Sequence, residues 1–308
     1  MTERVLRVGT RASALALAQS GAIASRVADL AGCGYELVRI RTEGDVNTGP
    51  LAAIGGTGVF VTAVRTALAD GRVDIIVHSY KDLPTAPADG LTLGAVPARE
   101  NPLDALCARD GAILKTLPAG ARVGTGSPRR AAQLLQRRPD VTVLPVRGNV
   151  DTRLRMVTDG AMDGVVLAVA GLSRLERSDA ITEVFPAEVM LPAPAQGALA
   201  VECRTSDVDS AWFSATLGAV DDAPSRAAAA AERALLRTLE AGCIAPVGAY
   251  ATVVGSTVTL TGAVIAVDGS SAVRGELSGA IDDAATIGRE LGLDLLSRGA
   301  GVLLGAAR

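Results

Sequence analysis

The tetrapeptide Arg-Val-Gly-Thr occurs twice in this chain, at residues 7–10 and again at residues 122–125. Each copy ends an apolar β-type run, and each is followed closely by a serine, Ser13 or Ser127, that can cap a helix. Strand and helix signals alternate after both copies, which is typical of α/β domains with parallel strands. We therefore expect two similar α/β domains with a pocket between them, because open α/β sheets bind ligands at the carboxyl ends of their strands.

The hydrophobic pattern predicts the individual elements of three domains. In the first it predicts strands at 6–9, 35–40 and 75–78 and helices at 13–28 and 60–70. In the second it predicts strands at 122–124, 141–144 and 165–168 and helices at 128–137 and 150–159. The third, a small α+β domain, has an alanine-rich helix ending near Leu239, strands at 247–254, 258–267 and 272–277, and a last helix from Asp282. We place the domains at 1–98 with 194–217, at 99–193 and at 218–308, with a proline-rich hinge leading into Gln196-Gly197.

Composition limits the partners of the chain. Hydrophobic residues make up 49% of its 308 residues but aromatic residues only 2%, so stacking platforms for single-stranded nucleic acid are scarce. The net charge is −3, and no apolar run approaches the roughly 20 residues that a membrane span needs. The four cysteines include no C-x-x-C pair and the single histidine cannot complete a zinc site. With neither a leader segment nor a sustained heptad pattern, we expect a cytoplasmic monomer that binds no metal, nucleic acid or membrane.

Residues 123–130 indicate an anion-binding site. Ser127 can cap a helix that starts at Pro128, which lacks the N–H that this position cannot use. Arg129 and Arg130 then stand in the first turn, where the helix dipole favours anions and guanidinium groups match carboxylate or phosphate. Because 28 of the 30 basic residues are arginines, an exposed, solvated pair is the alternative. Three further arginines follow later strands and either extend this basic lining or lie on the surface: Arg147, Arg153 and Arg174.

Residues 78–82, His-Ser-Tyr-Lys-Asp, follow an apolar strand. Their side chains should emerge at the same strand-end edge as Arg11, Ser13 and Arg129. Asp82 is the acid/base candidate, because a carboxylate among arginines can stabilise a developing positive charge or shuttle a proton. A solvated turn is the alternative. The only histidine, His78, is either a general base or, as we expect, a structural hydrogen-bonding group.

Two further segments have two interpretations each. The glycine-rich stretch 44–58 suits a mobile lid and equally a plain surface loop. Cys243 follows a helix among small residues that would leave its sulfur accessible. Most isolated cysteines, however, are small buried hydrophobic residues without chemistry.

Several short motifs occur in a fixed order between Arg7 and about Arg298. They are Arg-Ala-Ser at 11–13, Arg-Thr-Glu-Gly-Asp at 41–45, Gly-Gly-Thr-Gly-Val-Phe at 55–60, the 78–82 segment, 124–130, Arg-Gly-Asn at 147–149 with Arg153, 167–172, Gln-Gly-Ala at 196–198, and Gly242-Cys243 with Pro246. Together they are similar to the hydroxymethylbilane synthase family, also called porphobilinogen deaminases, of tetrapyrrole biosynthesis. The resemblance implies two hinged α/β domains like those of type II periplasmic binding proteins, followed by a small α+β domain that carries a cofactor cysteine.

The resemblance also implies a role for individual residues. Cys243 would hold a dipyrromethane cofactor through a thioether, and Asp82 would be the catalytic carboxylate. The residues that bind the cofactor would further include Lys81, Asp82, Ser127, Arg129, Arg130, Arg147 and Gly148. The carboxylates of substrate and growing chain would be bound by Arg11, Ser13, Arg147, Arg153, Arg174 and Gln196. The lid would contain Asp45, Gly55, Gly56, Gly58 and Phe60.

The activity that this resemblance implies is a transferase reaction on porphobilinogen. Four porphobilinogen molecules condense head to tail onto the dipyrromethane primer with loss of ammonia, and hydrolysis releases linear hydroxymethylbilane for porphyrin and heme biosynthesis. The chain departs from the family pattern where lysine, methionine, serine and leucine are common, at Thr57, Tyr80, Gly126 and Pro128. A non-catalytic carboxylate-binding protein is the alternative, and a phosphate-binding transferase is weaker because no P-loop motif is present.

Overall fold

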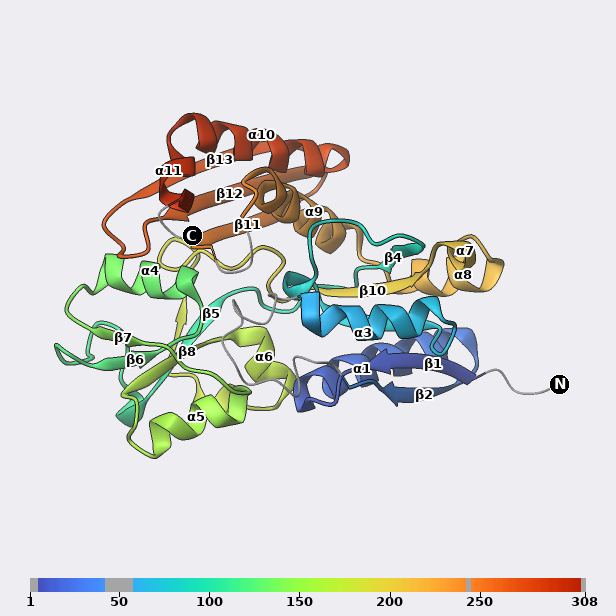
Figure 1. The fold of residues 1–308 in the computed structure, drawn as a ribbon, viewed down its shortest axis with the longest axis horizontal. Helices are drawn as coiled ribbons and strands as arrows, with labels where there is room; N and C mark the ends of the chain where they lie inside the picture. The colour runs from blue at the N-terminus through green and yellow to red at the C-terminus, as the bar shows by residue number, and fades with distance from the viewer. Residues whose placement is uncertain (1–4, 42–57, 242–244, 306–308) are drawn as a thin grey trace. The chain divides into compact units, whose positions relative to one another are not determined.

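A computed structural model describes residues 5–41, 58–241 and 245–305 (Figure 1). These residues form two compact units, Met1–Arg99 with Ala198–Arg226 and Glu100–Gly197 with Ala227–Arg308. Among the residues singled out from the sequence, Asp45, Gly55, Gly56, Thr57 and Cys243 lie outside the described ranges. None of the helices in those ranges is both long and apolar enough to cross a membrane.

The first unit is built on a five-stranded mixed sheet of order β2-β1-β3-β10-β4 (Figure 1). β1 (Val5–Thr10) runs parallel to β2 (Gly34–Arg39) and β3 (Ile75–Ser79). β10 (Leu199–Arg204) runs antiparallel to β3 and to β4 (Leu91–Ala95). Parallel neighbours need a crossover connection, and two helices, α1 (Ala14–Ala31) and α3 (Gly58–Ala69), supply it. Two shorter helices follow β10: α7 (Thr205–Val208) and α8 (Ala211–Val220).

The apolar run of β3 explains why helices cover both faces of this sheet. Ile75 and Val77 belong to the cluster that α1 and α8 close, whereas Ile76 packs with Val64 and Leu68 of α3. Successive strand side chains point to opposite faces, so a strand that is buried on both sides is apolar throughout. The carboxyl end of β3 is thereby fixed between two packed layers.

The second unit contains a sheet with the same arrangement, in the order β7-β6-β8-β5-β9. β6 (Arg122–Gly124) runs parallel to β7 (Thr142–Leu144) and β8 (Gly164–Ala168), and β5 (Asp104–Ala108) runs antiparallel to β8 and to β9 (Glu183–Phe185). Its helices are α4 (Pro128–Arg137), α5 (Val150–Thr158) and α6 (Val169–Arg174). β6, β7 and β8 therefore correspond to β1, β2 and β3, and β5 corresponds to β10.

The repeated tetrapeptide makes the same contacts in both sheets. The backbone N–H of Arg7 donates to Oδ2 of Asp74 at 2.8 Å, and the N–H of Asp74 donates back to the Arg7 carbonyl at 2.8 Å. Arg122 and Asp163 repeat this exchange at 2.7 and 2.8 Å. In both sheets the guanidinium also pairs with the aspartate, which directly precedes the third parallel strand. In each sheet the arginine of the repeat therefore has a structural role, since it links its strand to the aspartate that precedes a neighbouring strand.

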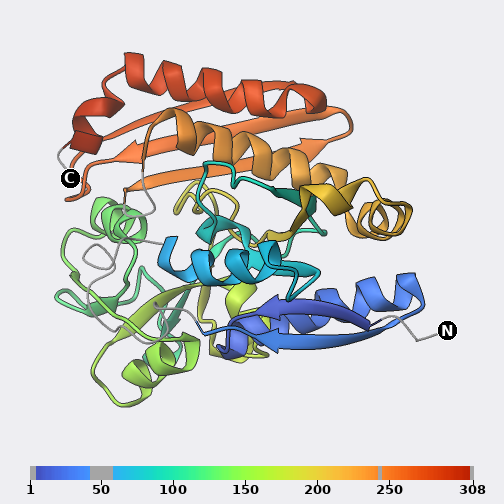
Figure 2. The same cartoon turned by 45° about the vertical axis from the view of Figure 1, so that its right-hand side comes forward.

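The remainder of the second unit is an antiparallel meander, β11 (Val247–Val254), β12 (Thr257–Ile265) and β13 (Ala272–Ala280) (Figure 2). The helices beside it are α9 (Ala223–Thr238), α10 (Ala284–Ser297) and α11 (Ala300–Gly305). One face of the sheet packs against Leu235 of α9 and Leu291 of α10. The other face presents Ile265 to Ala132 of α4 and to Leu191. The C-terminal sheet therefore supports the helix that carries the predicted arginine pair.

The structure confirms the expected mixed α/β class, and the sequence predicts most of these elements. β6, α4 and β11 begin and end at the predicted residues, and the other predicted elements are correct within a few residues. The last long helix begins at Ala284 after a 3₁₀ turn, and not at Asp282. The pattern misses the short helices and the strands that pair antiparallel in the two mixed sheets: β4, β5, β9, β10, α6, α7, α8 and α11.

Candidate functional site

The first unit has a pocket of about 100 Å³ at the carboxyl ends of β1 and β3. Its polar lining consists of Thr10, Arg11, Ser13, Gln19, His78, Ser79 and Asp82. Ser13 caps α1 by accepting a hydrogen bond from the Ala16 N–H at 3.3 Å. Asp82 is exposed and ends the 3₁₀ turn Tyr80–Asp82, which follows β3 and also contains Lys81. The structure thus brings Asp82 together with Arg11 and Ser13 at one edge of the sheet.

His78 contacts a buried carboxylate. Its Nε2 lies 3.1 Å from Oε2 of Glu202 on β10. Arg65 of α3 donates to both oxygens of that carboxylate, at 2.6 and 2.9 Å. Burial raises the pKa of Glu202, but the hydrogen bonds and charges of His78 and Arg65 outweigh it and lower the pKa to about 2. His78 thus lies against the Glu202 carboxylate and also lines the pocket, so its structural role stays a prediction.

This depressed pKa predicts an acid-sensitive contribution to stability. Because Glu202 loses its proton more readily in the folded chain, its charge stabilises the fold above the ordinary pKa of 4.5, and this is lost as the pH falls toward about 2. The contribution at neutral pH is on the order of 3 kcal/mol. We expect Glu202→Gln to lower the free energy of unfolding at pH 7, with the difference from the unchanged chain shrinking below pH 4.5 in urea titrations. Glu36→Gln, at an exposed position on β2, is the matched control, and an equal loss at every pH would contradict the assignment.

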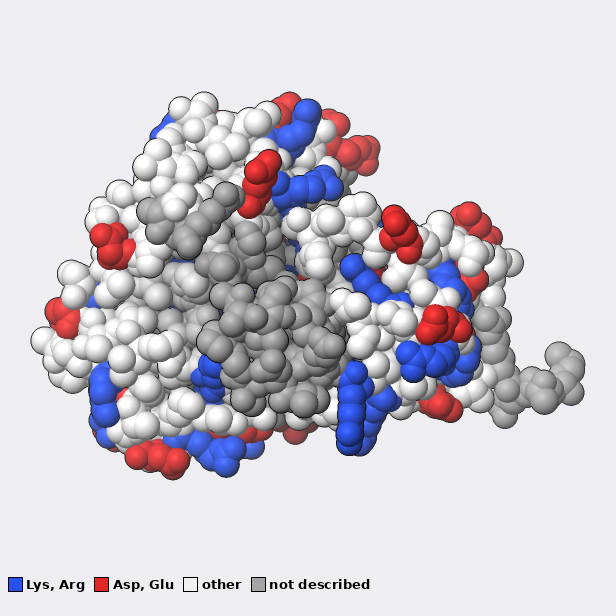
Figure 3. Space-filling view, in the orientation of Figure 1, with Lys and Arg blue, Asp and Glu red and all other residues white. Residues whose placement is uncertain are grey.

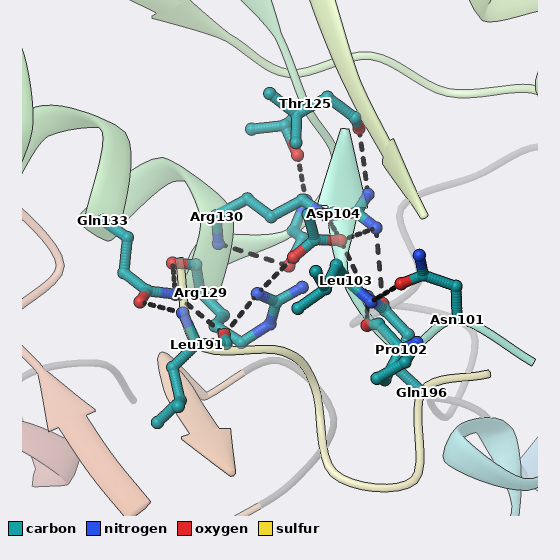
Figure 4. Close-up of polar contacts among 12 residues, drawn as sticks. Asn101, Pro102, Leu103, Asp104, Thr125, Arg129, Arg130, Gln133, Leu191 and Gln196 are labelled. Atoms are coloured by element: carbon teal, nitrogen blue, oxygen red, sulfur yellow. Dashed lines mark hydrogen bonds and ion pairs between the residues drawn. The ribbon is translucent and has the colours of Figure 1, made fainter. Parts of the chain in front are cut away.

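In the second unit the predicted arginine pair is buried. α4 begins at Pro128, and Ser127 caps it by accepting from the Arg130 N–H at 3.5 Å. Arg129 and Arg130 are only 3% and 6% exposed, and each pairs with a carboxylate oxygen of the fully buried Asp104 at 2.7 Å (Figure 4). The alternative of an exposed, solvated pair is therefore wrong. The guanidinium groups are held in place by a carboxylate of the protein itself.

Further hydrogen bonds fix this group. Nη1 of Arg129 also donates to the Leu191 carbonyl at 2.7 Å, and Nε2 of Gln196 donates to Oδ1 of Asp104 at 2.8 Å (Figure 4). Burial raises the pKa of Asp104, but the charges of Arg129 and Arg130 hold it well below its ordinary value. The buried Nε of Arg129 has no hydrogen-bond acceptor among the described residues. Two guanidinium groups thus share one carboxylate, and a donor is left over.

Three more predicted arginines extend the positive charge. Burial, together with the charges of Arg130 and Arg147, lowers the pKa of Arg153, whose Nε donates to the Gly148 carbonyl at 2.9 Å. Gly148 has a φ of 107°, which favours glycine. Arg174 donates to the Gly197 carbonyl at 2.7 Å, and burial lowers its pKa. Mutual repulsion among cations that are partly withdrawn from water is relieved when an anion binds.

This excess of positive charge is local, because the net charge of the whole chain is −3. On the one face drawn in Figure 3, acidic and basic side chains are interspersed over the described residues. Guanidinium groups match carboxylates in a bidentate geometry, so the cluster suits a small ligand with several carboxylates better than an extended polyanion. The fold and the arginine cluster therefore have the features of an α/β protein that binds compact polycarboxylates.

Comparisons with known proteins agree with this class. Residues 6–211 match the family model described as "Porphobilinogen deaminase, dipyromethane cofactor binding domain", and residues 227–297 match "Porphobilinogen deaminase, C-terminal domain". The porphobilinogen deaminase of Thermobifida fusca is 50% identical over 97% of this chain and 96% of its own length. Porphobilinogen deaminase 1 of Streptomyces avermitilis is 51% identical over 99% of both chains. The chain belongs to the porphobilinogen deaminase family, and the resemblance found in the sequence is confirmed.

Solved structures give more distant matches. One is a periplasmic substrate-binding protein of an ABC transporter from Coxiella burnetii, which is 15% identical, with a TM-score of 0.44, over 74% of this chain and 96% of that one. The methionine-binding protein MetQ matches with a TM-score of 0.43 and 15% identity over 70% of this chain and 89% of its own. A similarity at this level carries no argument about function.

The sequence interpretation misses two residues of these sites, Asp104 and Glu202. Asp104 opens the apolar strand β5, and a charged residue at the start of a buried strand is the one signal that points to it. Glu202 has a related signal, because it is a charged residue inside the apolar strand β10. Of the predicted lid residues, Gly58 and Phe60 lie in the first turn of α3. At Gly126 the chain departs from the serine that is common in the family. A Cβ atom there would lie 2.7 Å from the Val146 carbonyl oxygen, so a residue without a side chain fits this position.

Proposed function

We infer that this chain is a hydroxymethylbilane synthase, a transferase that joins four porphobilinogen molecules head to tail. Four porphobilinogen molecules and one water give one linear hydroxymethylbilane and four ammonia molecules. The observation that carries this inference is the identity of about half of all positions with porphobilinogen deaminases over nearly the whole length of both chains. The arginine cluster supports it, because each porphobilinogen brings an acetate and a propionate group that guanidinium groups can bind.

A dipyrromethane cofactor is implied by the family, and the described residues fit such a group. Arg129 and Arg130 share a single carboxylate, and Arg153 is repelled by its cationic neighbours, so within the described ranges the cluster has an excess of positive charge that a tetracarboxylate would balance. We propose Cys243 as the thioether attachment. The other residues proposed to hold the cofactor are Lys81, Asp82, Ser127, Arg129, Arg130, Arg147 and Gly148. When bound, the cofactor supplies the pyrrole terminus to which the first substrate is joined.

The chain's own residues bind the substrate and stabilise charge. Its carboxylates are bound by Arg11, Ser13, Arg147, Arg153, Arg174 and Gln196. When the C–N bond of the aminomethyl group breaks, ammonia leaves and the methylene carbon becomes part of a cation, which the Asp82 carboxylate stabilises. The terminal pyrrole carbon of the bound cofactor or growing chain would then form a C–C bond to this methylene carbon and would lose its proton. We propose that Asp82 holds the cation and takes part in this proton transfer.

The organisation expected from the sequence completes the proposal. Three domains, at 1–98 with 194–217, at 99–193 and at 218–308, would carry the substrate pocket, the arginine cluster and the cofactor cysteine respectively. The glycine-rich stretch 44–58 would act as a lid. A cytoplasmic monomer that binds no nucleic acid and no membrane remains the expectation from the sequence.

The intact mass of the purified chain under denaturing conditions tests the cofactor assignment. We expect an excess equal to two linked pyrrole units, located by peptide mass on Cys243. Cys243→Ala should abolish this excess, whereas Cys33→Ala, which changes a free and partly buried cysteine, should retain it. An unmodified chain that gains no mass on incubation with porphobilinogen would favour the non-catalytic binding protein. An adduct that persists in Cys243→Ala would place the attachment elsewhere.

A further inference from the structure

A buried glutamate on α9 binds two separate backbone segments of the second unit. Glu232 is 0% exposed, and its Oε2 accepts from the Ala195 N–H at 2.5 Å while its Oε1 accepts from the Ala251 N–H of β11 at 2.7 Å. A carboxylate withdrawn from water is retained only where its oxygens are satisfied. Glu232 therefore fixes the segment around Ala195 relative to the C-terminal sheet.

The segment that Glu232 binds has an unfavourable backbone conformation. Ala195 has a φ of 60°, in the left-handed region that alanine rarely adopts, and it is fully buried. Such a residue keeps this conformation only where its surroundings impose it. A further bond, from the Ala249 N–H to the Pro192 carbonyl at 2.9 Å, ties the same segment to β11. The bond from Ala195 to Glu232 is thus part of what imposes the left-handed turn.

The next residue along the chain belongs to the arginine cluster. Gln196 is 1% exposed, and its Nε2 donates to the Pro102 carbonyl at 2.7 Å and to Oδ1 of Asp104 at 2.8 Å. The same Asp104 oxygen accepts from Nε and Nη2 of Arg130 at 2.9 and 2.7 Å. The turn at Ala195 sets where the Gln196 side chain starts, and Gln196 in turn sets the orientation of Asp104.

We infer that Glu232 is a positioning residue for the carboxylate-binding site. It acts through the backbone of Ala195 and the side chain of Gln196 on Asp104, and so on the direction in which Arg129 and Arg130 point. This inference deepens the proposed function and rests on it, because the arginine cluster is taken as the site that binds substrate and cofactor carboxylates. The helix that precedes Cys243 thereby takes part in substrate binding from outside the cluster.

The kinetic test uses Glu232→Gln, which keeps the shape of the side chain but leaves only one acceptor oxygen for two N–H donors. We expect KM for porphobilinogen to rise about tenfold, while kcat changes less than about twofold. Gln196→Leu should raise KM by itself, and Glu232→Gln should add little in that background because the connection is already broken. If the double variant raises KM by the product of the two single effects, the inference is wrong. An unchanged KM in Glu232→Gln would also overturn it.

A second variant separates positioning from general destabilisation. Ala195→Gly allows the left-handed turn without support from Glu232, so Ala195→Gly combined with Glu232→Gln should recover most of the lost affinity. A purely structural role for Glu232 predicts no such recovery. The matched control is Glu276→Gln, at an exposed glutamate of β13 that accepts from Thr261, which should leave KM unchanged.

Hydrogen exchange on the full chain gives a readout that does not depend on turnover. In Glu232→Gln we expect faster exchange in peptides that cover 191–197 and 101–106, and unchanged exchange in 142–144 of the same unit. Equal acceleration throughout the unit would overturn the inference. If the unchanged chain fails to turn over porphobilinogen, the proposed function is wrong, while the exchange pattern still decides whether Glu232 positions Gln196 and Asp104.

Discussion

Replacing Asp82 with asparagine is expected to lower kcat by on the order of 100-fold or more, because a neutral amide cannot stabilise the cation that remains when ammonia leaves. The substitution keeps the size of the side chain, and Asp82 is exposed at the end of its 3₁₀ turn, so the fold should tolerate it. The measurement is steady-state turnover of porphobilinogen together with intact mass, which shows whether pyrrole units remain bound. We expect the variant to retain bound pyrroles while it turns over slowly.

The matched control is Asp89→Asn, an exposed aspartate that does not line the pocket. It should keep full activity, since it removes the same charge from the same unit. Undiminished turnover in Asp82→Asn would exclude Asp82 as the catalytic carboxylate. Loss of both turnover and bound pyrroles would assign Asp82 to binding alone.

The second large effect is expected from Asp104→Asn, which leaves Arg129 and Arg130 buried without a counter-charge. Removing one partner of a buried ion pair costs about 3–5 kcal/mol, because the remaining charge is uncompensated. Urea unfolding of the full chain, followed by circular dichroism, should show this loss at pH 7. Since the pKa of Asp104 is depressed, its contribution exists above the ordinary pKa of the group and is lost as the pH falls below it.

Two further variants make this expectation specific. Asp140→Asn removes an exposed aspartate that pairs with Arg138 in the same unit, and it should change stability little. Adding Arg130→Gln to Asp104→Asn should restore part of the lost stability, because one unpaired cation disappears. If Asp104→Asn alone does not accumulate as folded protein, this double variant still provides the test. Unchanged stability in Asp104→Asn would show that the pair does not hold α4 in place.

The elements that the sequence predicts correctly are those with local signals. α4 begins at its predicted residue because Ser127 caps it and proline occupies its first position, and both features can be seen in two consecutive residues. The repeated tetrapeptide marks the ends of β1 and β6 because its arginine makes the same hydrogen bonds to an aspartate in both sheets. The missed strands β5 and β10 lack such signals, since their partners β8 and β3 lie far away along the chain.

The residues of the candidate sites also divide into those with a local sequence signal and those without one. Arg129 and Arg130 can be found from their place at a helix start, and Asp82 from its place after a strand. The carboxylates that organise these sites cannot be found in this way, because Asp104, Glu202 and Glu232 function through neighbours that only the folded chain supplies. Tertiary contacts also decide that the arginine pair is buried, which neither arginine frequency nor helix position indicates.

The position of β10 has a consequence for the synthesis of the chain. β3 ends at Ser79, but its antiparallel partner begins only at Leu199, and β4 pairs with that same later strand. During translation, one edge of β3 and the inner edge of β4 therefore keep unpaired N–H and C=O groups until more than a hundred further residues have been made. The first sheet cannot be finished before the ribosome has passed the whole second sheet, so a nascent chain is most exposed to wrong strand pairing in that interval.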